Sequence, residues 1–341
     1  MNCKRMYIKL KKCAVPTLLA VLILLLTGCS ASGAFLPEST LPAGQRVVLP
    51  EAELPEATQL RDRATLYFRF QNEPYLAPET RIITQLTGQS FEQALLEALF
   101  AGPGTRVSEL NSLLPDSVQV LSTLRQGRVL LVSVSREFLN QLPDEPVDWQ
   151  EDDWWRQEMP LRRRLAMQSI VATVTENCDV DEVLILVQQR GQTNASLRLR
   201  QNWFLDDSED SVLTGPQTRD ESVLLGPERT VEAILSHWLQ RDWQGLYLYL
   251  LSADSADSQS RLSYRDFVSE MEGLPAVLSA ACAGCTVSLD GRQATATVSF
   301  SLRGEDGQAK PLPGRVLHLE RMNSIWKIDM AQLVGWLKEG T

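Results

Sequence analysis

One stretch decides how the first half of the chain folds: Ser90-Phe91-Glu92-Gln93-Ala94-Leu95-Leu96-Glu97-Ala98-Leu99-Phe100-Ala101-Gly102-Pro103-Gly104. Its apolar residues recur at helical spacing, and Ser90 is a suitable N-cap. Gly102 can adopt the left-handed conformation that ends a helix, and Pro103 cannot continue one. The stretch therefore predicts an amphipathic helix that ends in a chain reversal.

Predicted strands lie on both sides of this helix in the sequence. Strand-like runs rich in aromatic and β-branched residues precede and follow it, and a second helix is predicted from Pro160 to Glu176. The predicted strands cover residues 65–70, 81–84, 117–124, 128–135, 183–189 and 195–200. Arg162, Arg163 and Arg164 are expected on the solvated face of the second helix. This order of elements predicts a compact α+β sandwich with helices on one sheet face.

Four motifs of this region occur in a distinctive order: Thr65-Leu66-Tyr67-Phe68, Leu95–Pro103, Leu114-Pro115-Asp116, and Val132-Ser133-Val134-Ser135. They resemble the GerMN domain, the sporulation and spore germination domain of GerM-type lipoproteins. The resemblance covers residues 60–200. It implies an α/β sandwich similar to the ring-building motif, in a membrane-anchored, non-enzymatic protein with partners in sporulation complexes.

The first thirty residues have the features of an export signal. Basic residues end at Lys12, and the apolar run Cys13–Leu26 that follows is shorter than the roughly 20 residues of a spanning helix. Leu26-Thr27-Gly28-Cys29 resembles the bacterial lipobox, which implies lipidation of Cys29 (diacylglycerol, palmitate) and removal of a signal peptide, residues 1–28. Residues 29–59 are rich in Pro, Ala, Ser and Glu and are predicted to be a tether. We therefore expect a lipoprotein held at the extracytoplasmic face of the cell membrane.

The rest of the chain is predicted to form a second domain. Residues 201–228 are acidic, contain two Gly-Pro pairs and are expected to be a linker. In residues 229–341, short helices precede strands that alternate apolar and polar residues. This order resembles the nuclear-transport-factor-2-like (NTF2-like) α+β cone, which encloses a pocket that some relatives use for catalysis.

Composition and motifs argue against nucleic-acid binding and against the common kinds of catalytic site. The chain has 33 Lys+Arg against 43 Asp+Glu and a net charge of −10, which disfavours nucleic-acid partners. We find no phosphate-binding, dinucleotide-binding or zinc-protease motif, and expect no cofactor, no metal site and no enzymatic activity. The two histidines are His237 and His318. His237 could enter a pocket with Asp266 or Asp329 as its acid partner, although a structural histidine is the commoner case.

Two further groups of residues leave alternatives open. Cys282 and Cys285 have CxxC spacing, and we consider incidental core or loop residues, a local disulfide, or redox chemistry. Trp149, Trp154 and Trp155 lie in the acidic insertion 140–158. They form either a partner-binding patch or a set of side chains folded back over their own domain.

These observations lead to one main hypothesis and one alternative. The main hypothesis is a non-catalytic, lipid-anchored scaffold in sporulation or germination. Its partners are the membrane, other extracytoplasmic or intermembrane-space proteins, and further copies of itself. The alternative is an envelope protein that binds or hydrolyses a ligand in the C-terminal pocket. It predicts that substitution of His237 and Asp266 abolishes a small-molecule activity without affecting the fold.

Overall fold

The computed structural model describes residues 60–105, 107–191, 195–205, 211–251, 263–304 and 307–340. The chain divides into two units, residues 1–54 and 55–341, and all the described residues belong to the second. The predicted signal peptide, Cys29 and the tether 29–59 lie outside the described residues. Among the residues that are described, no helix is both long and apolar enough to cross a membrane.

The first sheet is built on a long antiparallel pair of strands. β1 (Leu60–Phe70) pairs with β2 (Leu76–Gln85) along nearly its whole length, and its end also pairs with the short β3 (Leu110–Asn111). Every residue from Leu66 to Phe70 in β1 is buried, so both faces of this end of the strand are covered. The strands predicted at residues 65–70 and 81–84 are confirmed, and both extend further than the sequence pattern indicates.

The second sheet combines antiparallel and parallel pairs. Its order is β4 (Val120–Gln126), β5 (Val129–Val134), β6 (Glu182–Gln188) and β7 (Ser196–Arg198), and β8 (Gln217–Thr218) also pairs with β6. A tight turn at Gly127, which has a φ of 62°, joins β4 to β5. β5 and β6 run parallel, so a crossover must connect them. A helix supplies that crossover.

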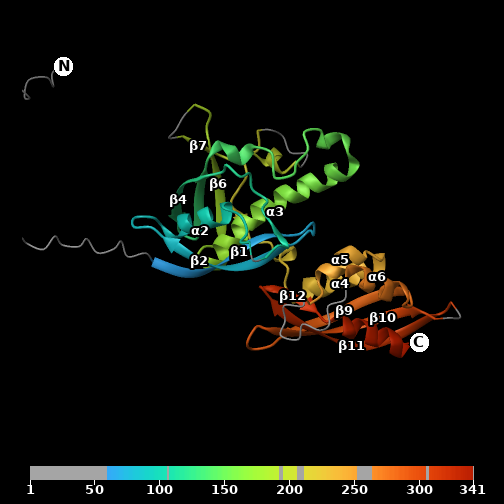
Figure 1. The fold of residues 1–341 in the computed structure, drawn as a ribbon. Coiled ribbons are helices and arrows are strands. Elements are labelled where there is room, and N and C mark those ends of the chain that lie inside the picture. Colours follow the sequence, from blue (N-terminus) through green and yellow to red (C-terminus); the bar gives the residue numbers. More distant parts are fainter. Residues whose placement is uncertain are drawn as a thin grey trace, which may run out of the picture. The chain divides into compact units, whose positions relative to one another are not determined.

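Two helices lie between these two sheets (Figure 1). α2 (Phe91–Phe100) begins as predicted, because the Ser90 side chain accepts a hydrogen bond from the Gln93 backbone, and Gly102 follows it with a φ of 84°. α3 (Asp153–Asn177) is the crossover between β5 and β6. α2 packs against β2 and β4, whereas α3 packs against β1 and β6. Each helix therefore joins the two sheets.

The predicted start of the second helix at Pro160 is wrong. α3 begins seven residues earlier, because the Asp152 carboxylate caps it by accepting hydrogen bonds from the backbones of Trp154 and Trp155. Pro160 lies inside the helix, where its ring removes one backbone donor. Between β5 and α3 the chain forms two short 3-10 turns, Arg136–Leu139 before the acidic insertion and Trp149–Glu151 within it.

A buried ionic network ties β1 to α3. The Glu158 carboxylate of α3 accepts hydrogen bonds from Arg69 of β1 and from Arg162, whose Nε lies 2.9 Å away. Arg69 also donates to the backbone carbonyls of Asn72 and Glu73 in the turn that leads to β2. The side chains of Arg69, Glu158 and Arg162 are each exposed by 10% or less. Arg162 thus lies inside the protein, which corrects the prediction of a solvated face.

The acidic segment that was expected to be a linker, residues 201–228, makes contacts with the first part of the chain where it is described. It contains β8 and two 3-10 turns, Gln201–Phe204 and Glu221–Val223. Trp203 is buried and stacks on Phe138, with ring centroids 5.1 Å apart. Gln168 of α3 also hydrogen bonds to the backbones of Thr218 and Asp220. These contacts hold the described parts of the segment against α3 and β6.

The C-terminal part consists of helices followed by an antiparallel sheet (Figure 1). The helices are α4 (Pro227–Gln240), α5 (Trp243–Leu248) and α6 (Tyr264–Glu272), and the chain ends with α7 (Met330–Gly340). The strands are β9 (Val277–Val287), β10 (Gln293–Arg303), β11 (Ala309–Met322) and β12 (Ile325–Ile328), in the order β12-β11-β10-β9. β10 buries every second residue, and α4 packs against that sheet. The alternation in the sequence is thus confirmed.

Candidate functional site

His237, near the C-terminal end of α4, lies between two carboxylates. Its Nδ1 is 2.8 Å from the Asp242 carboxylate, and its Nε2 is 3.1 Å from Glu73 in the turn between β1 and β2. Asp242 also accepts a hydrogen bond from the Gly245 backbone and so caps α5. A Cβ at Gly245 would lie 2.2 Å from Nδ1, so only glycine fits against the ring. The cluster therefore holds the imidazole in one orientation.

The environment of this imidazole favours its protonated form. Burial of the ring opposes protonation, but the hydrogen bonds and charges of Glu73 and Asp242 outweigh it and raise the pKa of His237 above its usual value. The buried Tyr249 ring lies 5.9 Å away, and burial raises the pKa of its hydroxyl. Both ring nitrogens are thus engaged, and the raised pKa keeps the Tyr249 hydroxyl protonated. This arrangement suits a structural cation better than a general base.

The acid partners that the sequence suggested for His237 are wrong. Asp266 lies in the first turn of α6, where it accepts a hydrogen bond from the Ser263 hydroxyl at the N-cap. Asp329 accepts one from the Ala331 backbone at the start of α7. Both carboxylates therefore belong to helix starts, and the partners of His237 are Glu73 and Asp242 instead.

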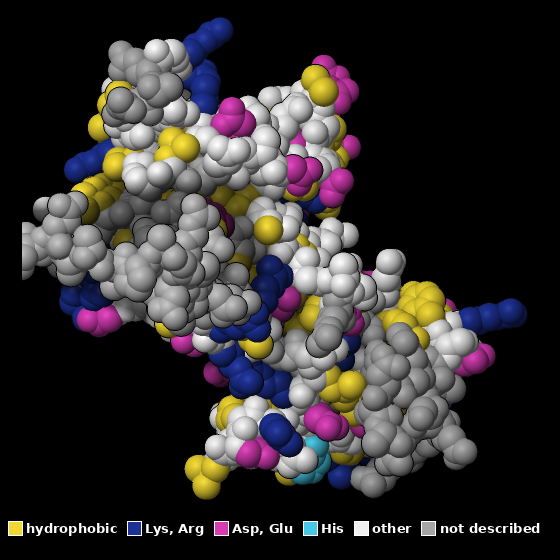
Figure 2. Space-filling model, turned by 60° about the vertical axis from the view of Figure 1, so that its left-hand side comes forward, with side chains coloured by type: hydrophobic (Ala, Val, Ile, Leu, Met, Phe, Trp, Pro, Cys, Tyr) yellow, Lys and Arg dark blue, Asp and Glu magenta, His cyan; other side chains and the backbone are white. Residues whose placement is uncertain are grey.

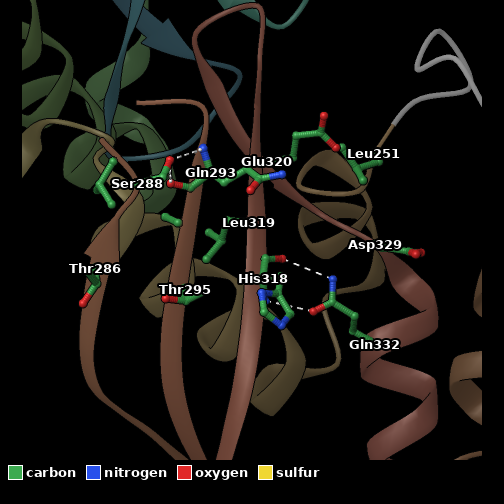
Figure 3. A pocket seen from close by; sticks show the side chains of 12 residues that line it. Leu251, Thr286, Ser288, Gln293, Thr295, His318, Leu319, Glu320, Asp329 and Gln332 are labelled. Carbon is green, nitrogen blue, oxygen red and sulfur yellow. Dashed lines mark hydrogen bonds between the residues drawn. The ribbon is translucent and has the colours of Figure 1, made fainter. Parts of the chain in front are cut away.

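His318 lines a separate, open cavity of about 440 Å³ on the C-terminal part (Figure 3). The cavity is mostly polar, and its lining includes Thr286, Ser288, Gln293, Thr295, His318, Glu320, Asp329 and Gln332. The Gln332 side chain reaches from α7 to the His318 backbone, accepting from its N–H at 2.8 Å and donating to its carbonyl. Among the described residues, the His318 imidazole makes no hydrogen bond to Glu320 or Asp329. No base–acid pair is therefore assembled in this cavity.

Cys282 and Cys285 lie in β9, on either side of a β-bulge. Gly284 pairs with Thr297 and Cys282 with Val298, which leaves Ala283 without a partner and turns both cysteines to the same face. Both are free thiols here and are half-buried. Burial, with the charges of Cys282 and Glu228, raises the pKa of Cys285, whereas a redox thiol needs a lowered one. The position in a strand and this pKa disfavour redox chemistry, and a disulfide stays a prediction.

We expect Cys178 to be almost inert while the chain is folded. It follows α3, and burial raises the pKa of its thiol to about 12. At pH 8, iodoacetamide should modify Cys178 about 100-fold more slowly in the reduced native chain than in urea, because the thiolate is the reactive form. Mass spectrometry of the Cys178 peptide measures both rates. Equal rates in the native and unfolded chain would contradict the raised pKa of this half-buried thiol.

The three tryptophans of the acidic insertion have different surroundings. Trp155 is half-buried, and the Arg162 guanidinium lies 4.8 Å from its ring centroid. Trp154 packs edge-on against Trp155 but remains 54% exposed, and Trp149 is half-buried in a 3-10 turn. Trp155 thus packs against Arg162, one member of the buried Arg69–Glu158–Arg162 network. A binding role for the patch of Trp149, Trp154 and Trp155 stays a prediction.

Sequence reasoning missed a basic cavity on the first part of the chain. Arg163, like Arg162, is not on a solvated face: it donates from Nη1 to the Trp203 carbonyl at 2.9 Å and helps line this cavity. Arg164 is exposed, as predicted. The other arginines of the cavity come from a 3-10 turn and from the end of the second sheet. They are scattered in the sequence, so no local motif signals the site.

The first part of the chain matches the model of one protein family. Residues 65–192 match a family model described as "Germane: Sporulation and spore germination". A search of curated proteins found no match. The sequence resemblance to the GerMN domain is confirmed for this segment. The likeness of residues 229–341 to the NTF2-like cone is not tested and stays a prediction.

Three solved structures align with a little under half of this chain at low identity. The tandem GerMN domains of the sporulation protein GerM from Bacillus subtilis align with 20% identity and a TM-score of 0.32, covering 49% of this chain and 47% of that one. The first GerMN domain of the same protein aligns with 14% identity and a TM-score of 0.25, covering 45% and 97%. A lipoprotein candidate from Clostridium perfringens aligns with 19% identity and a TM-score of 0.26, covering 47% and 89%. This chain thus spans about half the length of the tandem-domain structure.

The family match and the fold concern the same residues. Segment 65–192 contains most of β1, all of β2 to β6, and the helices α2 and α3, whereas β7 and β8 of the second sheet follow it. Residues 65–192, in the first folded part of the chain, therefore match the Germane family of sporulation and spore germination.

Proposed function

We propose that this chain is a lipid-anchored protein at the extracytoplasmic face of a bacterial cell membrane. It acts in sporulation or spore germination as a scaffold that binds other proteins. The match of residues 65–192 to the sporulation and spore germination family carries this proposal. The C-terminal part is the second binding or spacing module of the same scaffold.

The surroundings of the titratable residues support binding rather than turnover. His237 is fixed between Glu73 and Asp242, and Asp266 and Asp329 serve helix starts. A hydrolytic site needs a base with a free nitrogen beside a nucleophile. In the described residues, the candidates named from the sequence do not form such a pair.

The lipid anchor rests on the lipobox-like Leu26-Thr27-Gly28-Cys29 after a short apolar run. Acyl chains contribute about 0.8 kcal/mol per buried CH₂, so two or more chains on Cys29 hold a protein stably on a bilayer. The Pro- and Ala-rich segment 29–59 then separates the folded part from the membrane surface.

We expect Cys29→Ala to abolish incorporation of radiolabelled palmitate and to release the processed chain from the membrane fraction. The matched control is Cys13→Ala, which removes a cysteine from the apolar run of the signal and leaves the lipobox intact. Gel autoradiography and fractionation measure both effects. Palmitate labelling that survives Cys29→Ala, or membrane binding and spore formation that remain normal in that variant, would refute the proposal.

A further inference from the structure

A groove on the first folded part of the chain combines arginines with exposed leucines. It has a volume of about 800 Å³, which is room for several residues rather than a single ion. It lies between the 3-10 turn Arg136–Leu139, the middle of α3, strands β6 and β7, and the 3-10 turn Gln201–Phe204. We call it the arginine groove. Its charged lining consists of Arg136, Arg163, Arg190, Arg198 and Arg200.

The charge of the arginine groove is opposite to that of the chain. The chain carries a net charge of −10, yet none of the described residues that line the groove is an aspartate or glutamate. Arg136, Arg190 and Arg198 are exposed to solvent. Such a concentration of one sign repels cations and attracts carboxylates over the distance of about one Debye length.

Arg163 is the fixed member of this set. Its Nη1 donates to the Trp203 carbonyl, and its guanidinium lies 5.7 Å from the Trp203 ring centroid. Its Nε is buried and has no hydrogen-bond partner among the described residues. Burial lowers the pKa of Arg163, and the Glu145 carboxylate 3.7 Å away opposes that shift. The wall of the groove thus contains one cation that is rigid and incompletely hydrogen bonded.

The apolar part of the groove is also exposed. Leu139 is 47% exposed, Leu197 55% and Leu213 50%, and all three line the groove. Single exposed apolar side chains are common on protein surfaces, and the face in Figure 2 has several among its polar groups. Three exposed leucines that share one groove with arginines are typical of a binding surface.

The groove also adjoins the end of a sheet. β7 is the last strand in the order β4-β5-β6-β7, and Leu197 and Arg198 of β7 line the groove. Strands at sheet ends present unpaired backbone groups, so they accept extended segments of partner proteins. The side chains of such a segment alternate, which places every second one toward the groove.

We propose that the arginine groove binds an extended acidic segment of a partner protein, in which carboxylates alternate with apolar side chains. The carboxylates pair with Arg136, Arg190 and Arg198 in the planar geometry that guanidinium groups favour, and the apolar residues cover Leu139, Leu197 and Leu213. This inference rests on the proposed scaffold function and names the chemistry of its partner. The exposed leucines favour a peptide over a nucleic acid, whose backbone offers only phosphates and sugars.

The test uses the purified full chain in detergent and a fluorescent peptide of about ten alternating glutamates and leucines. We expect saturable binding that weakens at high salt, measured by fluorescence anisotropy. Replacing the glutamates with lysines, or the leucines with serines, should weaken binding at least 10-fold. Arg198→Glu combined with Arg190→Glu should have the same effect, and should create binding to the lysine–leucine peptide.

The matched control is Arg164→Glu, the same charge reversal at an exposed position of α3 outside the groove. Arg164→Glu should leave the affinity for the acidic peptide within twofold of that of the unsubstituted chain. Circular dichroism should show that all variants keep the fold. Leu197→Ser tests the apolar contact without a change of charge and should weaken binding at least fivefold.

Several results would overturn the inference. They are equal binding of the acidic and basic peptides, binding unchanged by the double reversal, and preference for a single-stranded oligonucleotide. Peptide binding that emerges only after Asp206, Asp207, Glu209 and Asp210 are neutralised would assign the groove to the chain's own acidic run. The proposed function fails separately, through the Cys29→Ala experiment, because peptide binding in detergent does not depend on the anchor.

Discussion

Glu158→Ala is expected to lower the free energy of unfolding by about 3–5 kcal/mol, because it leaves two buried guanidinium groups without their shared carboxylate. Arg69 is 2% exposed, and Arg162 is 8% exposed. The remaining hydrogen-bond partners of both arginines among the described residues are backbone carbonyls, which do not neutralise charge. Urea denaturation of the purified chain, followed by tryptophan fluorescence, measures the loss.

A matched exposed ion pair on the same helix provides the control. Arg156 pairs with Asp153, and both side chains are more than half exposed. Arg156→Ala should therefore change stability by no more than about 0.5 kcal/mol. Glu158→Gln keeps the shape of the side chain and some of its hydrogen bonding. The stability that it loses should therefore lie between the losses for Arg156→Ala and Glu158→Ala. A change below about 1 kcal/mol for Glu158→Ala would contradict the burial of this network.

The second large effect concerns the coupling between Glu73 and His237. The neighbouring carboxylates raise the pKa of His237 in the folded chain above the value of about 6.5 that it has when unfolded. A raised pKa means that protonation stabilises the fold. This contribution is fully present below the unfolded value and is lost as the pH rises through the folded one.

A double-mutant cycle at two pH values tests this coupling. We expect Glu73→Gln and His237→Asn to couple by about 1.5–3 kcal/mol at pH 5.5, where the bond is charge-assisted, and by less at pH 9. NMR titration gives an independent reading, since Glu73→Gln should lower the pKa of His237. Coupling that does not change with pH would show that His237 remains neutral.

The sequence predicted the elements whose signals are local. Ser90 and Gly102 bound α2 as expected, and the alternation from Ala294 to Leu302 predicted β10 and its buried face. The sequence pattern placed the start of α3 at Pro160, because proline is common in the first turn of a helix. The residue that begins the helix is instead the N-cap Asp152. Local patterns therefore predicted the elements better than their ends.

The surroundings of functional side chains were much less predictable. His237 was identified, but Glu73 lies 164 positions away in the chain, so only the fold reveals the contact. Asp242 lies five positions away and could have been found, because it follows α4 directly and caps α5. Likewise, Arg69 and Glu158 are 89 positions apart. Long-range contacts are set by topology, which periodicity alone does not encode.

The bond between Gln332 and the His318 backbone has a consequence for solubility. β11 runs from Ala309 to Met322, but β12 pairs only with its last four residues, so the rest of that edge lacks a strand neighbour within the described chain. The first residue of β11 beyond the part paired with β12 is His318, and the Gln332 side-chain amide hydrogen bonds to both its backbone N–H and its carbonyl. An incoming strand would have to displace it before it could extend the sheet. The C-terminal helix thus blocks strand addition at this one position of β11, where an exposed sheet edge would otherwise be open to aggregation.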